Sequence, residues 1–319
     1  MSRREAGLRA DLHVHSRHSG RASLPLLGRV AQECYAEPRE VYEAALRRGM
    51  DLVTLTDHDS IDGALEIAAL PGTFMGEEVT CALPGGRELH LGVFDFHEWQ
   101  HQHIALRRHD AEALFAYLAE QRLPVVANHL FSALTGRRAL ADLDLALRHA
   151  THVETLNGAL PASSNRWARR AAMEARHPMV GGSDAHTLSG VASAWTIVPG
   201  AGTREDFLEG LREGRTIPVG RSGTYRRLTL AIAGLVASSC GAAWSTLAEP
   251  GGGRRALATL LAALALPALP LITAGLLANE VLFGRRYGRA FEEARGRRGT
   301  VPRRAPGPAP ALPTAGRAA

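Results

Sequence analysis

The 319-residue sequence contains no lysine, so arginine supplies all 37 basic side chains. Cysteine is scarce, and its spacing matches neither a metal-binding motif nor a disulfide framework: Cys34, Cys81 and Cys240. We therefore expect a reducing compartment. The opening stretch MSRREAGLRADL has no apolar core, which argues against a secretory signal and favours a cytoplasmic location. Histidine is plentiful, but all 14 residues lie before position 187.

Charge separates an acidic first part of the chain from a basic end. Residues 1–225 carry a net charge of −4, whereas residues 285–319 carry +7. The basic end is rich in proline, alanine and glycine, which predicts a largely disordered tail over residues 286–319. Such a tail could contact nucleic acid or anionic lipid without deciding the substrate, and nucleic acid is not the favoured partner.

Two uncharged stretches precede the tail, at residues 228–248 and 256–279. The second is long enough to cross a bilayer. A membrane hairpin within residues 228–283, attached to the cytoplasmic face, is therefore one prediction for the apolar helical segment 223–285. The alternative is a pair of helices packed on residues 1–222 or on a partner chain.

Short β-like runs alternate with amphipathic stretches through residues 1–222, the predicted catalytic domain. We predict strands at 11–15, 51–56, 73–79, 88–94, 123–128, 152–156, 178–182 and 194–198. We predict helices at 38–49, 104–122, 141–149, 165–177 and 203–214. The alternation favours an α/β fold with parallel strands, in a barrel or an open sheet.

Histidine, acidic and amide side chains recur at or just after the ends of these strands. They are His13, His15, Asp57, His58, Glu77, Glu78, His90, Asn128, His129, Glu154, Asn157, Asp184 and His186. Parallel α/β barrels build their sites at this edge, so we expect these groups to converge. Residues i and i+2 of a strand share a face, so His13 and His15 can hold one ion together. Imidazole beside carboxylate suits Zn, Mn or Fe, and so many ligands indicate more than one ion.

The ordered motifs DLHVHS, TLTDHDS, GEE, HLGVF, NHL, ETLNG and GGSDAH resemble the PHP family, named for polymerase and histidinol phosphatase, over residues 10–222. The resemblance implies a distorted (β/α)7 barrel and a metal-dependent phosphoesterase with two or three divalent ions. It implies metal ligands at His13, His15, His58, Glu78, His90, His129, Asp184 and His186. Glu78 would bridge two ions, because Gly76 sets the register of the family's Gly-x-Glu motif. His58 and His186 would hold a third ion.

One position departs from the family pattern in a way that affects the third ion. A Ser-Asp pair usually follows the HxH motif, and its Asp serves that ion, but here the pair is Ser19-Gly20. Glycine has no ligand atom, so the site loses a donor unless His18 or water replaces it. The number of ions, two or three, is left open by the sequence.

We predict hydrolysis of a phosphomonoester or nucleotide-type substrate by a metal-activated water. His58 or His186 would assist proton transfer to the leaving oxygen, and Asp57 would orient a ligand imidazole. A catalytically weakened PHP domain, acting as a metal-binding interaction or scaffold module, is one alternative. A PHP-type exonuclease is another, although the acidic residues 1–225 lack interleaved basic and aromatic stretches for a nucleic-acid strand.

Overall fold

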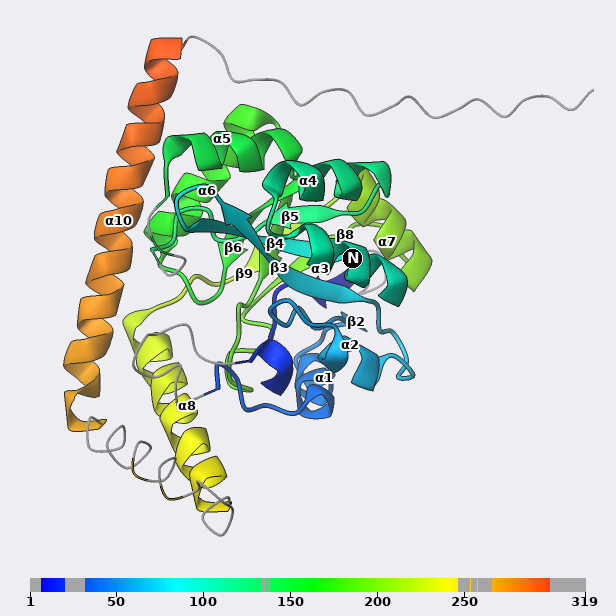
Figure 1. Ribbon diagram of the computed structural model, residues 1–319. Coiled ribbons are helices and arrows are strands. Elements are labelled where there is room, and N and C mark those ends of the chain that lie inside the picture. The colour runs from blue at the N-terminus through cyan, green and yellow to red at the C-terminus, as the bar shows by residue number, and fades with distance from the viewer. Residues whose placement is uncertain are drawn as a thin grey trace, which may run out of the picture.

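The computed structural model describes residues 7–20, 32–133, 136, 138–245, 253, 257 and 266–298. Figure 1 shows an α/β body flanked by two long helices, α8 (Tyr225–Ser245) and α10 (Leu269–Arg298). Helix α10 packs against both α8 and α6 (Ala162–Ala175). The apolar segment therefore includes helices that lie beside the body.

The described strands form two sheets. One has the order β2-β1-β8-β9, with β1 at Leu8–Asp11, β2 at Leu52–Val53, β8 at Ala194–Val198 and β9 at Ile217–Gly220. The other has the order β3-β4-β5-β6-β7, with β3 at Gly76–Leu83, β4 at Arg87–Phe94, β5 at Val125–Ala127, β6 at His152–Asn157 and β7 at Met179–Gly182. Pairing is parallel for β1–β2, β5–β6 and β6–β7, and antiparallel for the rest.

The mixed α/β fold is confirmed, whereas a closed (β/α)7 barrel is not found in the described residues and stays a prediction. The prediction of parallel strands holds for only three of the seven described pairings, and the other four are antiparallel, among them that of β3 with β4. Pro84, Gly85 and Gly86 join β3 to β4, and both glycines have positive φ, which allows a tight reversal. The two strands therefore pair antiparallel, without an intervening helix. The isolated bridge between His58 and Glu78 brings the chain after β2 against β3.

The remaining helices of the body are α1 (Pro38–Arg47), α2 (Asp62–Ile67), α3 (Glu98–Arg107), α4 (Ala111–Glu120), α5 (Leu140–His149) and α7 (Arg204–Glu213). The prediction of one helix over 104–122 is wrong, because a cap interrupts it. The Asp110 side chain accepts hydrogen bonds from the backbone N–H groups of Glu112 and Ala113, which starts α4. Thr203 caps α7 as predicted.

Helix α10 contributes to the largest hydrophobic core of the body. Its Tyr287 and Phe291 are buried, and their rings lie 5.5 and 6.0 Å from the ring of Phe131. Gly288 lies so close to Trp167 that the helix has no room for a side chain there. Residues 286–298, predicted as part of the tail, are therefore helical, and residues 299–319 lie outside the described part.

No helix that the structure describes combines the length and the apolarity needed to cross a membrane. Most of residues 246–265, which include the start of the second predicted span, lie outside the described residues. The membrane hairpin within residues 228–283 stays a prediction.

Candidate metal centre

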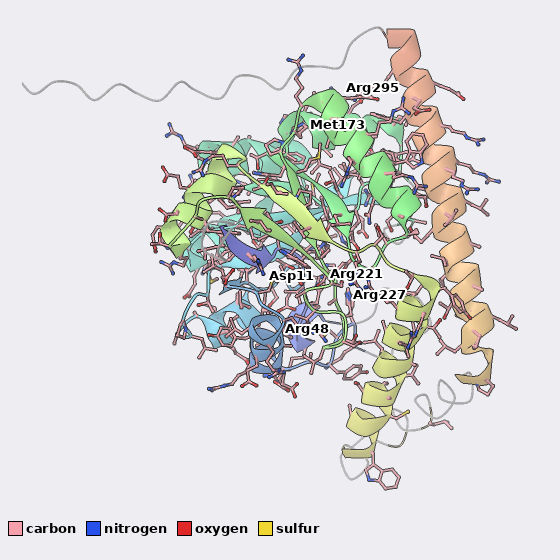
Figure 2. The ribbon with its side chains drawn as sticks, turned by 180° about the vertical axis from the view of Figure 1, so that it is seen from behind. Asp11, Arg48, Met173, Arg221, Arg227 and Arg295 are labelled. Carbon is pink, nitrogen blue, oxygen red and sulfur yellow. The ribbon has the colours of Figure 1, made fainter. Side chains whose placement is uncertain are left out.

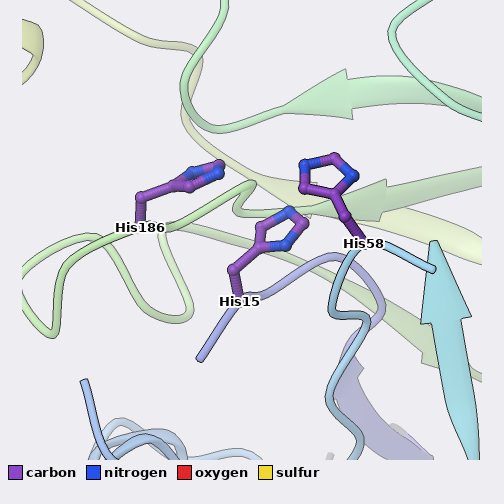
Figure 3. Close-up of side chains that lie close together, drawn as sticks. All are labelled: His15, His58 and His186. Carbon is purple, nitrogen blue, oxygen red and sulfur yellow. The ribbon is translucent and has the colours of Figure 1, made fainter. Parts of the chain in front are cut away.

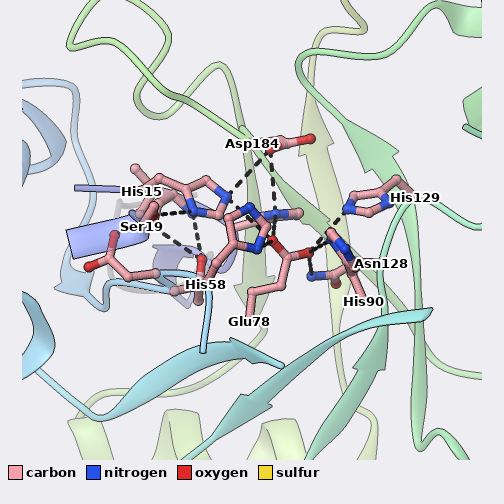
Figure 4. A network of polar contacts seen from close by, with 12 residues as sticks. His15, Ser19, His58, Glu78, His90, Asn128, His129 and Asp184 are labelled. Carbon is pink, nitrogen blue, oxygen red and sulfur yellow. Dashed lines mark hydrogen bonds and ion pairs between the residues drawn. The ribbon is translucent and has the colours of Figure 1, made fainter. Parts of the chain in front are cut away.

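Five imidazoles surround the carboxylate of Glu78, which projects from β3 and is fully buried (Figure 4). Ring nitrogens of His13 and His58 each lie 3.2 Å from Oε2 of Glu78, and Nε2 of His129 lies 3.1 Å from Oε1. The corresponding distances from His15 and His90 are both 3.5 Å. We call the eight predicted ligands, gathered around this carboxylate, the cup.

The HxH pair lies just beyond β1 instead of within it. Strand β1 ends at Asp11, yet the alternation of side chains continues, since Val14 packs in a hydrophobic core while His13 and His15 face the cup. A bridge from Val14 to Ala185 holds this segment against the chain after β7. The prediction that both rings point the same way is confirmed by this placement.

Asp184 closes the cup on the side opposite Glu78. Its Oδ1 lies 3.5 Å from Nε2 of both His13 and His15. Its backbone N–H donates a 2.6 Å hydrogen bond to the carbonyl of His13, so the loop after β7 is held against the HxH segment. The contact joins residues distant in sequence, as expected for groups at one edge of the fold.

All eight predicted ligands fall into four overlapping groups, within each of which the candidate ligand atoms lie within 4.8 Å of one another. The groups are His15, His58 and His186; His13, His15 and Asp184; His13, Glu78 and His129; and His58, Glu78 and His90. Within the described structure, several of their buried atoms make no hydrogen bond: Nε2 of His13, His15 and His186, and Oε2 of Glu78. Such atoms are costly to bury unless they coordinate a cation, so the cup fits divalent metal.

The electrostatics of the cup depend on a balance between burial and carboxylate charge. Burial lowers the pKa of His13, but the charges of Glu78 and Asp184 outweigh it and raise that pKa well above its usual value. Burial dominates at His58 and His186, lowering the pKa of the first well below its usual value and that of the second to about 4. Both rings are therefore neutral at pH 7, the form that binds metal.

Comparisons with known proteins agree with this arrangement. A family model described as PHP-associated matches residues 162–216, the part of the chain that includes Asp184 and His186. This match supports the resemblance of the chain to the PHP family. The matched segment begins with α6, includes α7 and ends just before β9, so it contains two of the eight residues of the cup.

A curated relative of this chain is the uncharacterized protein MJ1587 of Methanocaldococcus jannaschii, 35% identical over 72 residues. The alignment covers 23% of this chain and 40% of that protein, so the chain matches less than half of its relative. The chain also resembles two solved structures, a likeness that concerns the fold.

The first solved structure is PsfC from Pseudomonas syringae, with a TM-score of 0.51 and 20% identity, covering 72% of this chain and 97% of that one. The second is a two-domain protein from Bacteroides vulgatus containing a predicted PHP-like metal-dependent phosphoesterase. Its TM-score is 0.51 at 19% identity, covering 73% of this chain and 71% of that one.

Glu154 supports two residues of the cup, the His13 ring and the backbone of His129. Its Oε1 lies 2.8 Å from Nδ1 of His13, and its Oε2 accepts a 2.9 Å hydrogen bond from the backbone N–H of His129. Asn157 donates to the same Oε2 and also to Asp184 Oδ2, both at 3.0 Å. The sequence placed Glu154 and Asn157 at the strand ends but gave them no role, because the contacts join separate strands.

Replacing Glu154 by glutamine should weaken metal binding by roughly 10–100-fold, as substitutions beside ligand imidazoles commonly do. The amide cannot accept hydrogen bonds with both of its terminal atoms, so either the His13 ring or the His129 loop loses its support. Isothermal titration of the metal-free protein with Zn²⁺ or Mn²⁺ measures the change. Glu174→Gln, on the exposed face of α6, is the control, and equal affinities in the two variants would contradict the positioning role.

The hydroxyl group of Ser19 connects Asp57 to the ring of His15. Asp57 accepts hydrogen bonds from Ser16 and Ser19 at distances of 2.6 to 2.7 Å, and Ser19 Oγ lies 3.0 Å from Nδ1 of His15. The geometry agrees with the hypothesis that Asp57 orients a ligand imidazole, but the orientation passes through Ser19.

His18 lies outside all four groups. Its Nε2 is 2.7 Å from Glu66 on α2, and Arg17 contacts the same carboxylate. Nearer the cup, the oxygens of Glu33 lie 3.5 Å from His58 and 3.6 Å from His186. The sequence gave no signal for Glu33, because the stretch around it contains no metal-type spacing.

Proposed function

We propose that this protein is a PHP-family metal-dependent hydrolase that acts on phosphoric esters. The observation that carries the proposal is the convergence of buried imidazoles and carboxylates on Glu78, with unbonded ligand atoms facing one another. Two to three divalent ions bound there, such as Zn, Mn or Fe, would lower the pKa of a water and polarise the phosphoryl group. The eight residues of the cup would hold them, with Glu78 shared between neighbouring groups.

The choice of phosphoric ester follows partly from analogy. The Bacteroides vulgatus protein that shares the fold contains a predicted PHP-like metal-dependent phosphoesterase. Fold likeness alone does not carry an activity, so the donor set of this chain must support it. Mixed imidazole and carboxylate ligands, in overlapping groups, suit the several-ion sites that hydrolyse phosphoesters.

An arginine-lined cavity at the start of α8 supports an anionic substrate. The cavity has a volume of about 460 Å³ and is lined by Arg221, Ser222, Thr224, Arg226, Arg227 and Leu230. Strand β9 runs in the direction of β1, so residues after β9 reach the edge where His13 lies. Figure 2 shows Arg221 and Arg227 close together near the start of α8. Guanidinium groups match phosphate oxygens in geometry and charge.

A short path of hydrogen bonds joins this cavity to the cup. Ser222 Oγ accepts a 3.0 Å hydrogen bond from the side chain of Asn165. Asn165 Oδ1 in turn accepts from the backbone N–H of Asn157, whose side chain donates to Asp184. We propose that a small phosphorylated molecule occupies both places, with its reacting phosphate in the cup.

The low pKa of His58 and His186 bears on their proposed roles. A ring that is neutral at pH 7 is in the form that binds metal. It is poorly suited to donating a proton to a leaving oxygen. We therefore propose both rings as metal ligands first, with proton transfer as a secondary role.

The test uses the full-length chain, stripped of metal and reloaded separately with Zn²⁺, Mn²⁺ or Fe²⁺. We expect metal-dependent hydrolysis of para-nitrophenyl phosphate and nucleoside monophosphates, lost with EDTA, and little hydrolysis of para-nitrophenyl acetate. Degradation of a single-stranded oligonucleotide alone would favour the exonuclease alternative. Metal binding without turnover of any phosphoester would favour the scaffold alternative and overturn the proposal.

A further inference from the structure

One of the four groups in the cup contains imidazoles alone. The rings of His15, His58 and His186 converge on one another (Figure 3), with ring centroids 4.7 Å apart for His15–His58 and 4.3 Å for His15–His186. Glu78 and Asp184 belong to the other groups. Three imidazoles supply three ligands to an ion, so this position has room for a further donor, and a carboxylate would also offset the charge of the ion.

The carboxylate of Glu33 lies against two of these three rings. Its Oε2 is 3.5 Å from Nε2 of His58, and its Oε1 is 3.6 Å from Nε2 of His186. Its side chain is mostly buried, at 19% exposure, as expected for a group facing the cup. Because each oxygen faces a different ring, the carboxylate lies between the rings of His58 and His186.

Gly20 holds the backbone of Glu33. The Glu33 N–H donates a 3.0 Å hydrogen bond to the Gly20 carbonyl. Gly20 has a φ of +80°, a conformation that favours glycine over any residue with a side chain. The glycine that lacks a ligand atom therefore has a structural reason to be glycine: it turns the chain and receives the backbone of Glu33.

Further contacts fix the Glu33 segment on the loop that carries His15. Cys34 is fully buried, and its thiol lies 3.5 Å from the carbonyl oxygen of His15. The Arg17 N–H donates a 2.9 Å hydrogen bond to the carbonyl of Ala36. The position of Glu33 is thus set by packing on both sides of the HxH loop.

We infer that Glu33 supplies the carboxylate of a third metal position, together with His15, His58 and His186, in place of the one missing at Gly20. The inference rests on the proposed function only in that the cup binds divalent metal. His18 does not take this role, because its ring is bound to Glu66 on the outer side of the loop.

The test counts ions instead of turnover. Metal-free full-length protein is dialysed against Mn²⁺ or Zn²⁺, and bound metal per chain is measured by elemental analysis. We expect about three ions in the unaltered protein and about two in Glu33→Gln, or a roughly 10-fold or greater loss in the affinity of the weakest ion. His18→Ala is the matched control and should bind the same number as the unaltered protein.

Two results would overturn the inference: only two ions in the unaltered protein, or equal number and affinity in Glu33→Gln. Glu33→Gln keeps the size and the backbone N–H of the residue, so its metal-free thermal unfolding should match that of the unaltered protein. Glu33→Asp, which keeps the charge on a shorter arm, should retain part of the affinity. Hydrolysis is measured separately, so a protein that binds three ions without turnover would count against the proposed function and not against the role of Glu33.

Discussion

Replacing Glu78 by glutamine should slow metal-dependent phosphoester hydrolysis by roughly 10²–10³-fold or more, and should lower the metal content of the protein. Glu78 is fully buried and belongs to two of the four ligand groups. Burial alone would raise the pKa of its carboxyl, but the positive charges of His13 and His90 outweigh burial and hold that pKa well below the usual value. The neutral amide would remove the carboxylate charge from the centre of the cup and turn an N–H₂ group toward metal.

The neighbouring residue provides a matched control for this change. Glu77 lies on the opposite face of β3, where its Oε2 is 2.7 Å from Nδ1 of His101 on α3. Glu77→Gln should therefore leave the metal content unchanged, although both residues are buried acids in the same strand. Turnover under saturating substrate and bound metal per chain are measured for both variants. Loss of metal in Glu77→Gln, with retention in Glu78→Gln, would reverse the assignment.

Replacing Phe291 by alanine should lower the free energy of unfolding of the whole protein by about 3–5 kcal/mol, the range for a buried phenylalanine. Phe291 is 2% exposed, packs on Phe131, and lies under the guanidinium of Arg295 at 4.5 Å. The truncation would leave a cavity between α10 and the body. Chemical denaturation followed by circular dichroism measures the change.

Leu282, on the same helix, is the control for Phe291. It is 53% exposed, so Leu282→Ala should change the free energy of unfolding by no more than about 0.5 kcal/mol. Equally small effects at both positions would mean that α10 is not part of the cooperative unit.

The attachment of α10 has a consequence for the cup. Glu280, on this helix, accepts a 2.9 Å hydrogen bond from the backbone N–H of Ala133, in the loop that follows His129. A segment far along the chain therefore supports a loop that carries a cup residue. Experiments on the site need the chain through α10, and a fragment that ends at residue 222 would lack this support.

The sequence by itself predicted which side chains meet in the cup. The resemblance to the PHP family picked out the eight proposed ligands from the polar side chains at the strand ends. The alternation of strand side chains placed His13 and His15 on one face. The family's Gly-x-Glu motif, with Gly76 setting the register, distinguished Glu78 from Glu77, and the structure places these two residues on opposite faces of β3. Their roles in metal binding and catalysis remain predictions to be tested.

Tertiary structure decided the features that depend on contacts between distant segments. Strands β3 and β4 pair antiparallel, and Phe291 of α10 packs on Phe131 in the core. The periodicity of the sequence predicted neither contact. The sequence left His18 as the candidate to replace the missing carboxylate, but packing turned His18 toward Glu66 and brought Glu33 to the cup. The spacing of side chains along a strand predicts which face of the sheet a residue lies on. Which residue it contacts there depends on how segments distant in sequence pack together.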